Sequence, residues 1–99
     1  MYLVRLLKSA EKDKKLLKPV GLERTAKELL RIMTVNPWQT PPPYEKLVGD
    51  MRGSYSRRIN KQHRIVYAVI ANDEGLIDAN GKLYDGIVLV KSMWGHYDD

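Results

Sequence analysis

A stretch with a period of two residues, over 55–70, limits the folds open to this 99-residue chain more than any other feature. In "YSRRIN" one set of alternate positions holds Tyr55, Arg57 and Ile59, and "HRIVYAVI" alternates in the same way after a short polar segment. Because successive side chains of a strand point to opposite faces, the pattern predicts a β-hairpin. The later apolar run "DGIVLVKSM" predicts a buried strand beyond a polar loop.

The first third of the chain predicts a strand followed by two helices. Residues 2–8 are largely apolar at both sets of alternate positions, as expected of a buried strand. Ser9 is a candidate N-cap for a short helix over 10–18, which Pro19 ends. A second helix over 22–34 carries an apolar stripe at helical spacing, formed by Leu22, Ala26, Leu29, Leu30 and Met33.

The order of these elements predicts an α+β fold in one domain, residues 1–99. Two N-terminal helices would pack on one face of a twisted, mainly antiparallel sheet of four to five strands, and the other face would stay free and partly basic. No stretch approaches the ~20 apolar residues of a membrane span, and no targeting segment stands at the N-terminus. We therefore expect a cytoplasmic protein.

The positive charge of the chain is unevenly distributed. The net charge is +5, and no acidic residue lies between Asp50 and Asp73, where five cations gather: Arg52, Arg57, Arg58, Lys61 and Arg64. Self-repulsion disfavours such clustering in a compact domain, so the pattern favours a polyanionic partner over an ordinary solvated surface.

Several chemistries have no support in the sequence. The chain has no Cys, which excludes disulfides, thiolate nucleophiles and Cys-ligated zinc. It has no glycine-rich phosphate loop, and its two histidines are not spaced for a metal site. We expect no metal and no other cofactor.

The remaining polar residues suit metal-free cleavage of RNA. That reaction needs a base for the ribose 2′-OH, cations for the charge on the phosphorane, and an acid for the leaving 5′-oxygen. Glu45, delivered by the stiff segment "NPWQTPPPY", could be the base, Arg58 and Arg64 the cations, and His96 the acid. Each of these residues taken alone is more often simply exposed to solvent, so the spacing by itself is weak evidence.

Two longer segments resemble a known family. "NPWQTPPPYEKLVGDMRGSYSRRINKQHRIVYAV" and the terminal "MWGHYDD" are similar to the Txe/YoeB toxins, within the RelE/ParE superfamily. The most specific motif is G-x-Y-S-R-R-I-N-x-x-H-R-x-V-Y. The resemblance implies a RelE-like fold and a ribosome-dependent endoribonuclease that cuts messenger RNA in the A site. It also implies a cognate antitoxin, and it leaves open whether the chain forms a homodimer.

The resemblance also implies roles for individual residues. Glu45 matches the general base, Arg64 the arginine that stabilises the transition state, His96 the general acid and Tyr97 a residue that positions the nucleotide. Arg58 matches an arginine that contacts phosphate. Further candidates for contact with RNA or phosphate are Arg57, Lys46 and Lys61, of which Arg57 and Lys61 are expected on ribosomal RNA or in solvent.

The sequence departs from the family pattern in three places. Val48 stands where some members carry a lysine three residues after the base, and Lys46 is the nearest cation. The segment 71–86 is longer than the turn of compact members, which indicates an insertion. Asp98 and Asp99 follow the His-Tyr pair.

Two alternative functions fit parts of the same pattern. A toxin of the ParE type, which acts on gyrase, would share the fold but need no base and acid. A non-catalytic RNA-binding module would need only the basic face, and would leave no product with a 2′,3′-cyclic phosphate.

Overall fold

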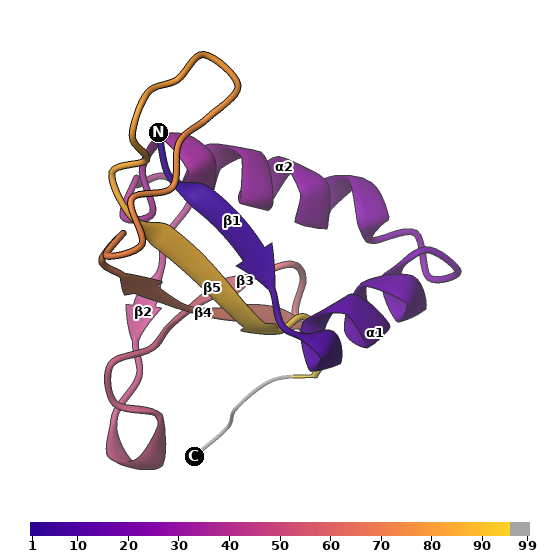
Figure 1. Cartoon of the computed structure of the whole chain (residues 1–99). Helices are drawn as coiled ribbons and strands as arrows, with labels where there is room; N and C mark the ends of the chain where they lie inside the picture. The colour runs from indigo at the N-terminus through magenta and orange to yellow at the C-terminus, as the bar shows by residue number, and fades with distance from the viewer. Residues whose placement is uncertain (96–99) are drawn as a thin grey trace.

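The structure of the chain, a computed structural model, describes residues 1–95. A mixed five-stranded sheet in the order β1-β5-β4-β3-β2 forms one layer and two helices form the other (Figure 1). The elements in chain order are β1 (Leu3–Leu6), α1 (Lys8–Leu17), α2 (Glu23–Val35), β2 (Glu45–Lys46), the 3-10 helix η1 (Gly49–Met51), β3 (Tyr55–Arg58), β4 (Arg64–Ile70) and β5 (Ile87–Ser92).

The sheet is mainly antiparallel, as the sequence predicts. Strands β2, β3, β4 and β5 pair antiparallel in succession, and β1 adds to β5 in parallel register. A bulge between Val66 and Tyr67 shifts the β4–β5 register, so that Val66 lies opposite Ser92 and Tyr67 opposite Val90. The hairpin predicted over the period-two stretch is the β3–β4 pair, with Arg58 opposite Arg64.

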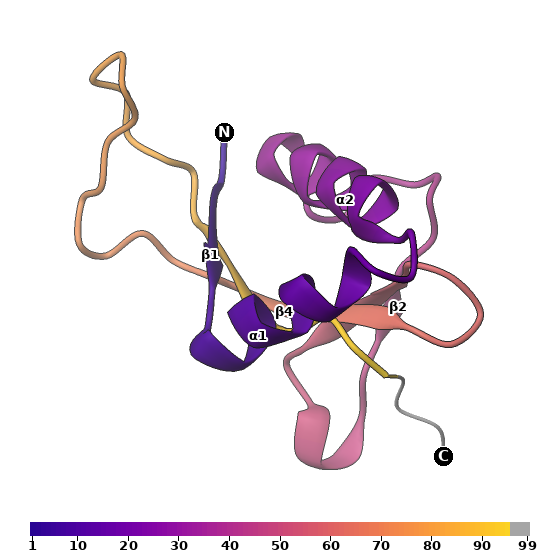
Figure 2. The same ribbon diagram turned by 90° about the vertical axis from the view of Figure 1, so that its right-hand side faces the viewer.

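Both helices lie on the same side of the sheet, which Figures 1 and 2 show from two directions. The predicted stripe of α2 packs into the core, with Ala26, Leu29 and Met33 buried. Leu17 of α1 is fully buried as well, and burial of such a side chain stabilises the fold by about 1.5–3 kcal/mol. From the sheet the core takes alternate residues, which include Ile65, Tyr67, Val88 and Val90.

The start of the first helix differs from the prediction. Helix α1 begins at Lys8, its N-cap position is Leu7, and Ser9 lies inside the first turn. The N-cap prediction for Ser9 is wrong because the sheet pairing extends to Leu7, whose N–H donates to the Val90 carbonyl at 2.9 Å. The Ser9 hydroxyl instead donates to the Lys91 carbonyl at 2.7 Å, which fastens α1 to β5.

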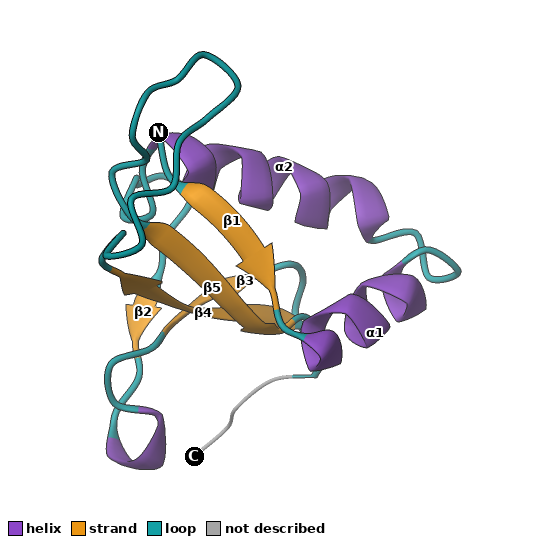
Figure 3. Cartoon of the chain, viewed as in Figure 1, coloured by secondary structure: helices purple, strands orange, loops and turns teal. Residues whose placement is uncertain are grey.

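The segment 71–86 forms a long loop (Figure 3) that extends beyond the sheet, on the far side of β1 from the helices in Figure 2. Ile77 and Leu83 form an isolated antiparallel bridge across it. At its base the Asn72 amide donates to the carbonyls of Leu76 and Tyr84, at 2.9 and 3.1 Å. No helix within residues 1–95 is long and apolar enough to cross a membrane.

Candidate active site

Arg57 fixes the proline-rich segment that leads to the candidate base. Its side chain is 1% exposed, on the same side of β3 as Tyr55, whose ring packs against the core. One terminal nitrogen, Nη1, donates to the Pro42 carbonyl at 2.6 Å, and Nη2 donates to the carbonyls of Pro37 and Gln39 at 2.8 and 2.9 Å. A single guanidinium therefore holds the segment 37–42 against the sheet.

The expectation that Arg57 contacts RNA or lies in solvent is accordingly corrected. Its two terminal nitrogens are bonded to backbone carbonyls, and its Nε is buried as well. The guanidinium carbon also lies 5.4 Å from the centre of the Tyr44 ring, an arrangement that favours a cation–π attraction. Arg57 therefore holds the fold together and is not available to contact a phosphate.

An aromatic cluster forms a second attachment for the same segment. The Tyr67 hydroxyl donates to the Pro37 carbonyl at 2.7 Å, and burial raises the pKa of Tyr67. Trp38 meets Tyr2 and Tyr55 edge to face, with ring centres 6.1 and 6.4 Å apart. The segment that precedes β2 is therefore held firmly against the sheet. This positions Glu45, although β2 itself is only two residues long.

Glu45 and Arg64 meet on the face of the sheet that the helices leave free. Glu45 lies opposite Ser56 in the β2–β3 register. Glu45 Oε1 is 3.3 Å from Arg64 Nη1, and the same nitrogen donates to the Ser56 hydroxyl at 3.0 Å. The Glu45 side chain is 59% exposed and that of Arg64 only 12%, so the carboxylate is open to a ligand while the guanidinium is held in place.

Arg58 joins this face from the neighbouring strand. It is exposed, directly opposite Arg64 in the β3–β4 register, and alternation places it on the same face as Ser56. Two cations opposite each other on adjacent strands repel, and an anion between them removes that cost. The free face therefore carries a guanidinium group from each strand of the β3–β4 hairpin.

The other residues predicted for the site are not brought to the Glu45–Arg64 pair within the described part of the chain. Lys46 lies opposite Tyr55, on the other face of β2 from Glu45, so the register does not bring it to the Glu45–Arg64 pair. Lys61 is exposed in the turn between β3 and β4. The predicted acid His96 and the predicted positioning residue Tyr97 lie outside the described residues.

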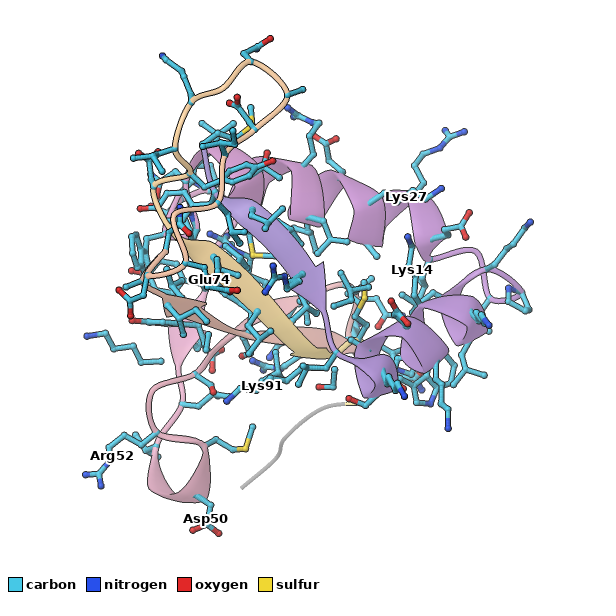
Figure 4. All side chains as sticks on the ribbon, in the orientation of Figure 1. Lys14, Lys27, Asp50, Arg52, Glu74 and Lys91 are labelled. Carbon is cyan, nitrogen blue, oxygen red and sulfur yellow. The ribbon has the colours of Figure 1, made fainter. Side chains whose placement is uncertain are left out.

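Two serines and a lysine beside this site were missed by sequence reasoning. Ser54 and Ser56 are each 1% exposed, and the Lys91 ammonium donates to the Ser54 hydroxyl at 2.8 Å. Figure 4 labels Lys91 on β5, and Arg52 on the η1 segment that projects away from the sheet. The sequence "SYS" could have indicated these two serines, because alternation along a strand puts both of them on one face.

The position at which some members of the family carry a lysine is open to solvent. Val48, which precedes η1, is 83% exposed and has no charge with which to replace that lysine. Within residues 1–95, no group of three His, Asp or Glu side chains is arranged to hold a metal ion. The chemistry that the described part of the site offers is that of a carboxylate beside a fixed guanidinium, suited to proton transfer at an anionic centre.

Comparison with known proteins gives a family match over most of the chain. The model of a family described as the YoeB-like toxin of bacterial type II toxin-antitoxin systems matches residues 7–81. The Toxin YoeB of Synechocystis sp. (strain ATCC 27184 / PCC 6803 / Kazusa) is 35% identical over 63 residues. That alignment covers 64% of this chain and 66% of the relative, just under two thirds of the relative's length.

Solved structures share the fold over nearly the whole chain. A YoeB/ParE toxin from Agrobacterium tumefaciens superposes with a TM-score of 0.76 at 24% identity, over 96% of this chain and 99% of that one. The heterotetrameric YoeB-YefM toxin-antitoxin complex from Staphylococcus aureus gives a TM-score of 0.68 at 26% identity, over 98% and 99% of the two chains. The two-layer α+β architecture is therefore that of the RelE/ParE toxins.

Proposed function

Because this chain belongs to the YoeB-like toxins of bacterial type II toxin–antitoxin systems, we propose that it is an endoribonuclease that cleaves messenger RNA on the translating ribosome. The observation that carries the proposal is the Glu45–Arg64 pair, with Oε1 and Nη1 3.3 Å apart on the free face of the sheet. A gyrase-directed toxin of the ParE type or a non-catalytic RNA binder needs no such pair of base and cation.

The proposed reaction is attack of a ribose 2′-oxygen on the adjacent phosphorus. Glu45 takes the proton of the 2′-OH, the new bond from oxygen to phosphorus forms, and the bond to the 5′-oxygen breaks. The 5′-oxygen receives a proton from His96, and Tyr97 positions the nucleotide. The products are a 2′,3′-cyclic phosphate and a free 5′-OH, so no water and no metal enter the scheme.

Arg64 stabilises the negative charge that builds on the phosphorane oxygens. Its bond to Ser56 and its 12% exposure hold the guanidinium in one place before RNA binds, so little reorganisation is needed in the transition state. In the free protein Glu45 neutralises Arg64. When a phosphate binds, it replaces the Glu45 carboxylate as the partner of the Arg64 guanidinium. The exposed carboxylate of Glu45 is then free to accept a proton.

RNA binding would use the cations around this pair. Arg58 lies opposite Arg64 and supplies a second guanidinium for the same phosphate. Lys61 and Lys46 are exposed and would contact ribosomal RNA farther from the cut, which is consistent with the net charge of +5. The site of action would be the cytoplasm, where ribosomes translate.

The proposed protein partner is a cognate antitoxin. The S. aureus relative is an assembly of YoeB with YefM, described as a heterotetramer. An acidic or amphipathic segment would cover the basic free face, neutralise its charge and occlude Glu45 and Arg64. A second copy of this chain is a further proposed partner, because a YoeB dimer from the same organism also shares the fold.

Expression of the chain alone, with cut sites mapped on ribosome-bound messenger, tests the proposal. The wild type should arrest growth and cut translated messenger, whereas Glu45→Gln and His96→Gln should do neither. Glu74→Gln, an exposed acid of the 71–86 segment, is the matched control and should cut as the wild type does.

Two further measurements separate the alternatives. Co-expression of the neighbouring open reading frame should restore growth if it encodes the antitoxin. A gyrase supercoiling assay should show no inhibition. Full toxicity of Glu45→Gln and His96→Gln with intact messenger and blocked gyrase would establish the ParE-type alternative instead.

A further inference from the structure

Gly95 is held from two sides by consecutive residues at the start of β4. Its N–H donates to Nδ1 of His63 at 2.8 Å, and its carbonyl accepts from the N–H of Arg64 at 2.9 Å. The ring of Trp94 stacks on the His63 imidazole, with centres 4.0 Å apart and planes inclined by 28°. Three contacts therefore tie residues 94–95 to the β3–β4 hairpin.

The hydrogen bond defines the tautomer of His63. A backbone N–H can only donate, so Nδ1 must be unprotonated, and the neutral ring carries its proton on Nε2. The base of the side chain is fixed as well, because the Asn60 Oδ1 accepts from the backbone N–H groups of Gln62 and His63 at 2.9 and 2.8 Å. The backbone that carries the acceptor, Nδ1 of His63, is therefore held in place by Asn60.

Gly95 itself is required by the backbone at this point. Its φ is +83°, in the left-handed region that favours glycine, although no atom within 4 Å would meet an added Cβ. The bonds from His63 and Arg64 hold the bend at residues 94–95 in that conformation. The next residue in the sequence is His96, the proposed general acid.

We propose that His63 is a positioning residue of the site: through Nδ1, and with the help of the Trp94 stack, it holds Gly95, the residue that precedes the proposed acid His96 in the sequence. The role of His96 rests on the proposed function, whereas the anchor is a property of residues 63, 94 and 95. Arg64 connects the two parts of the site, since its side chain contacts Glu45 and its backbone N–H holds Gly95.

Three substitutions separate the ring from the acceptor. His63→Asn places Oδ1 close to the position of Nδ1 and so keeps the acceptor without the ring. His63→Phe keeps a ring that can stack on Trp94 but has no acceptor, and His63→Ala has neither. Gln62→Ala, at the preceding exposed position of the same turn, is the control.

The anchor is measured first without any assay of activity. In the labelled wild-type chain, nitrogen NMR should show His63 with an unprotonated Nδ1 and a protonated Nε2. Hydrogen exchange of the Gly95 amide should rise about fivefold to tenfold in His63→Phe and His63→Ala, as expected from loss of one hydrogen bond, and stay near the wild-type rate in His63→Asn. Equal exchange in the wild type and His63→Phe would overturn the anchor.

The consequence for the reaction is measured on ribosome-bound messenger. Loss of positioning should lower kcat about 10- to 100-fold in His63→Ala and His63→Phe, with KM nearly unchanged because the binding cations are intact. His63→Asn should recover much of the loss, which a merely structural role of the ring would not allow. Full kcat in His63→Ala, or greater activity in His63→Phe than in His63→Asn, would overturn the proposal.

The two arms distinguish the failure of this proposal from failure of the proposed function. If the wild type cuts no messenger, the proposed function is wrong, while NMR still decides whether His63 anchors Gly95. If the wild type cuts and Glu45→Gln does not, the proposed function stands and the His63 series alone decides the positioning role. Thermal unfolding of each variant identifies any loss of kcat caused by misfolding.

Discussion

Replacement of Arg57 by methionine should destabilise the fold far more than replacement of its neighbour Arg58. Methionine keeps an unbranched stem of similar shape but removes three hydrogen bonds to the carbonyls of Pro37, Gln39 and Pro42. It also removes the cation near the Tyr44 ring. Because these carbonyls hold the segment that leads to Glu45, the loss should appear in both stability and activity.

The size of the effect follows from these contacts. Hydrogen bonds to a charged group contribute about 1.5–3 kcal/mol each, so three give about 5–9 kcal/mol. Removal of a buried guanidinium also removes its desolvation cost of several kcal/mol. We therefore expect Arg57→Met to lower the free energy of unfolding by about 3 kcal/mol, and Tm by about 12–24 °C for a domain of this size.

Urea and thermal unfolding of the purified chain measure the effect. Arg57→Lys should fall between the wild type and Arg57→Met, because the ammonium keeps the charge but not the planar fork. Arg58→Met, on the exposed face of the same strand, should shift Tm by less than about 3 °C while it weakens binding to RNA. A loss below about 1 kcal/mol in Arg57→Met would refute the assignment of Arg57 as the residue that holds the proline segment.

Two further substitutions test contacts of the site and of the core. Ser56→Ala removes the hydroxyl that accepts from Arg64, and should lower kcat about fivefold to tenfold, as expected from one hydrogen bond of about 1 kcal/mol, with little change in Tm. Tyr67→Phe removes the bond to the Pro37 carbonyl and should lower the free energy of unfolding by about 1 kcal/mol at pH 8. Because burial raises the pKa of Tyr67 above its ordinary value of 10.0, its contribution is complete below about pH 10 and is lost as pH rises through the folded-state pKa. Urea unfolding between pH 8 and pH 11 should therefore show a smaller loss of stability in Tyr67→Phe than in the wild type.

The sheet and the helices were predictable because their patterns are local. Alternation over 55–70 predicted the β3–β4 pair, and the stripe through Met33 predicted the buried side of α2. The boundary at Ser9 was not predictable from local preference, because it depends on pairing between Leu7 and Val90, which are distant in sequence. The parallel addition of β1 to β5 is likewise a property of the assembled sheet.

The errors and omissions at the site have one physical cause: the contacts that decide them join residues far apart in the sequence. Alternation placed Arg57 beside Tyr55 and Ile59, but its charge suggested a surface position, and its three carbonyl partners come from a segment 15 to 20 residues away. Residue chemistry and the family resemblance both placed Glu45 and Arg64 in one site, but their contact could not be derived from the spacing. His63 was missed because its partner lies 32 residues farther along the chain.

The chemistry of the cut ends tests the proposed activity most directly. Purified wild type and Glu45→Gln would each be added to ribosomes paused on a defined messenger, and the ends of the fragments determined. We expect the wild type to produce a single cut in the A site, with a 2′,3′-cyclic phosphate and a 5′-OH, and Glu45→Gln to leave the messenger intact. An uncut messenger with the wild type, or the same cut with Glu45→Gln, would contradict the role assigned to the Glu45–Arg64 pair.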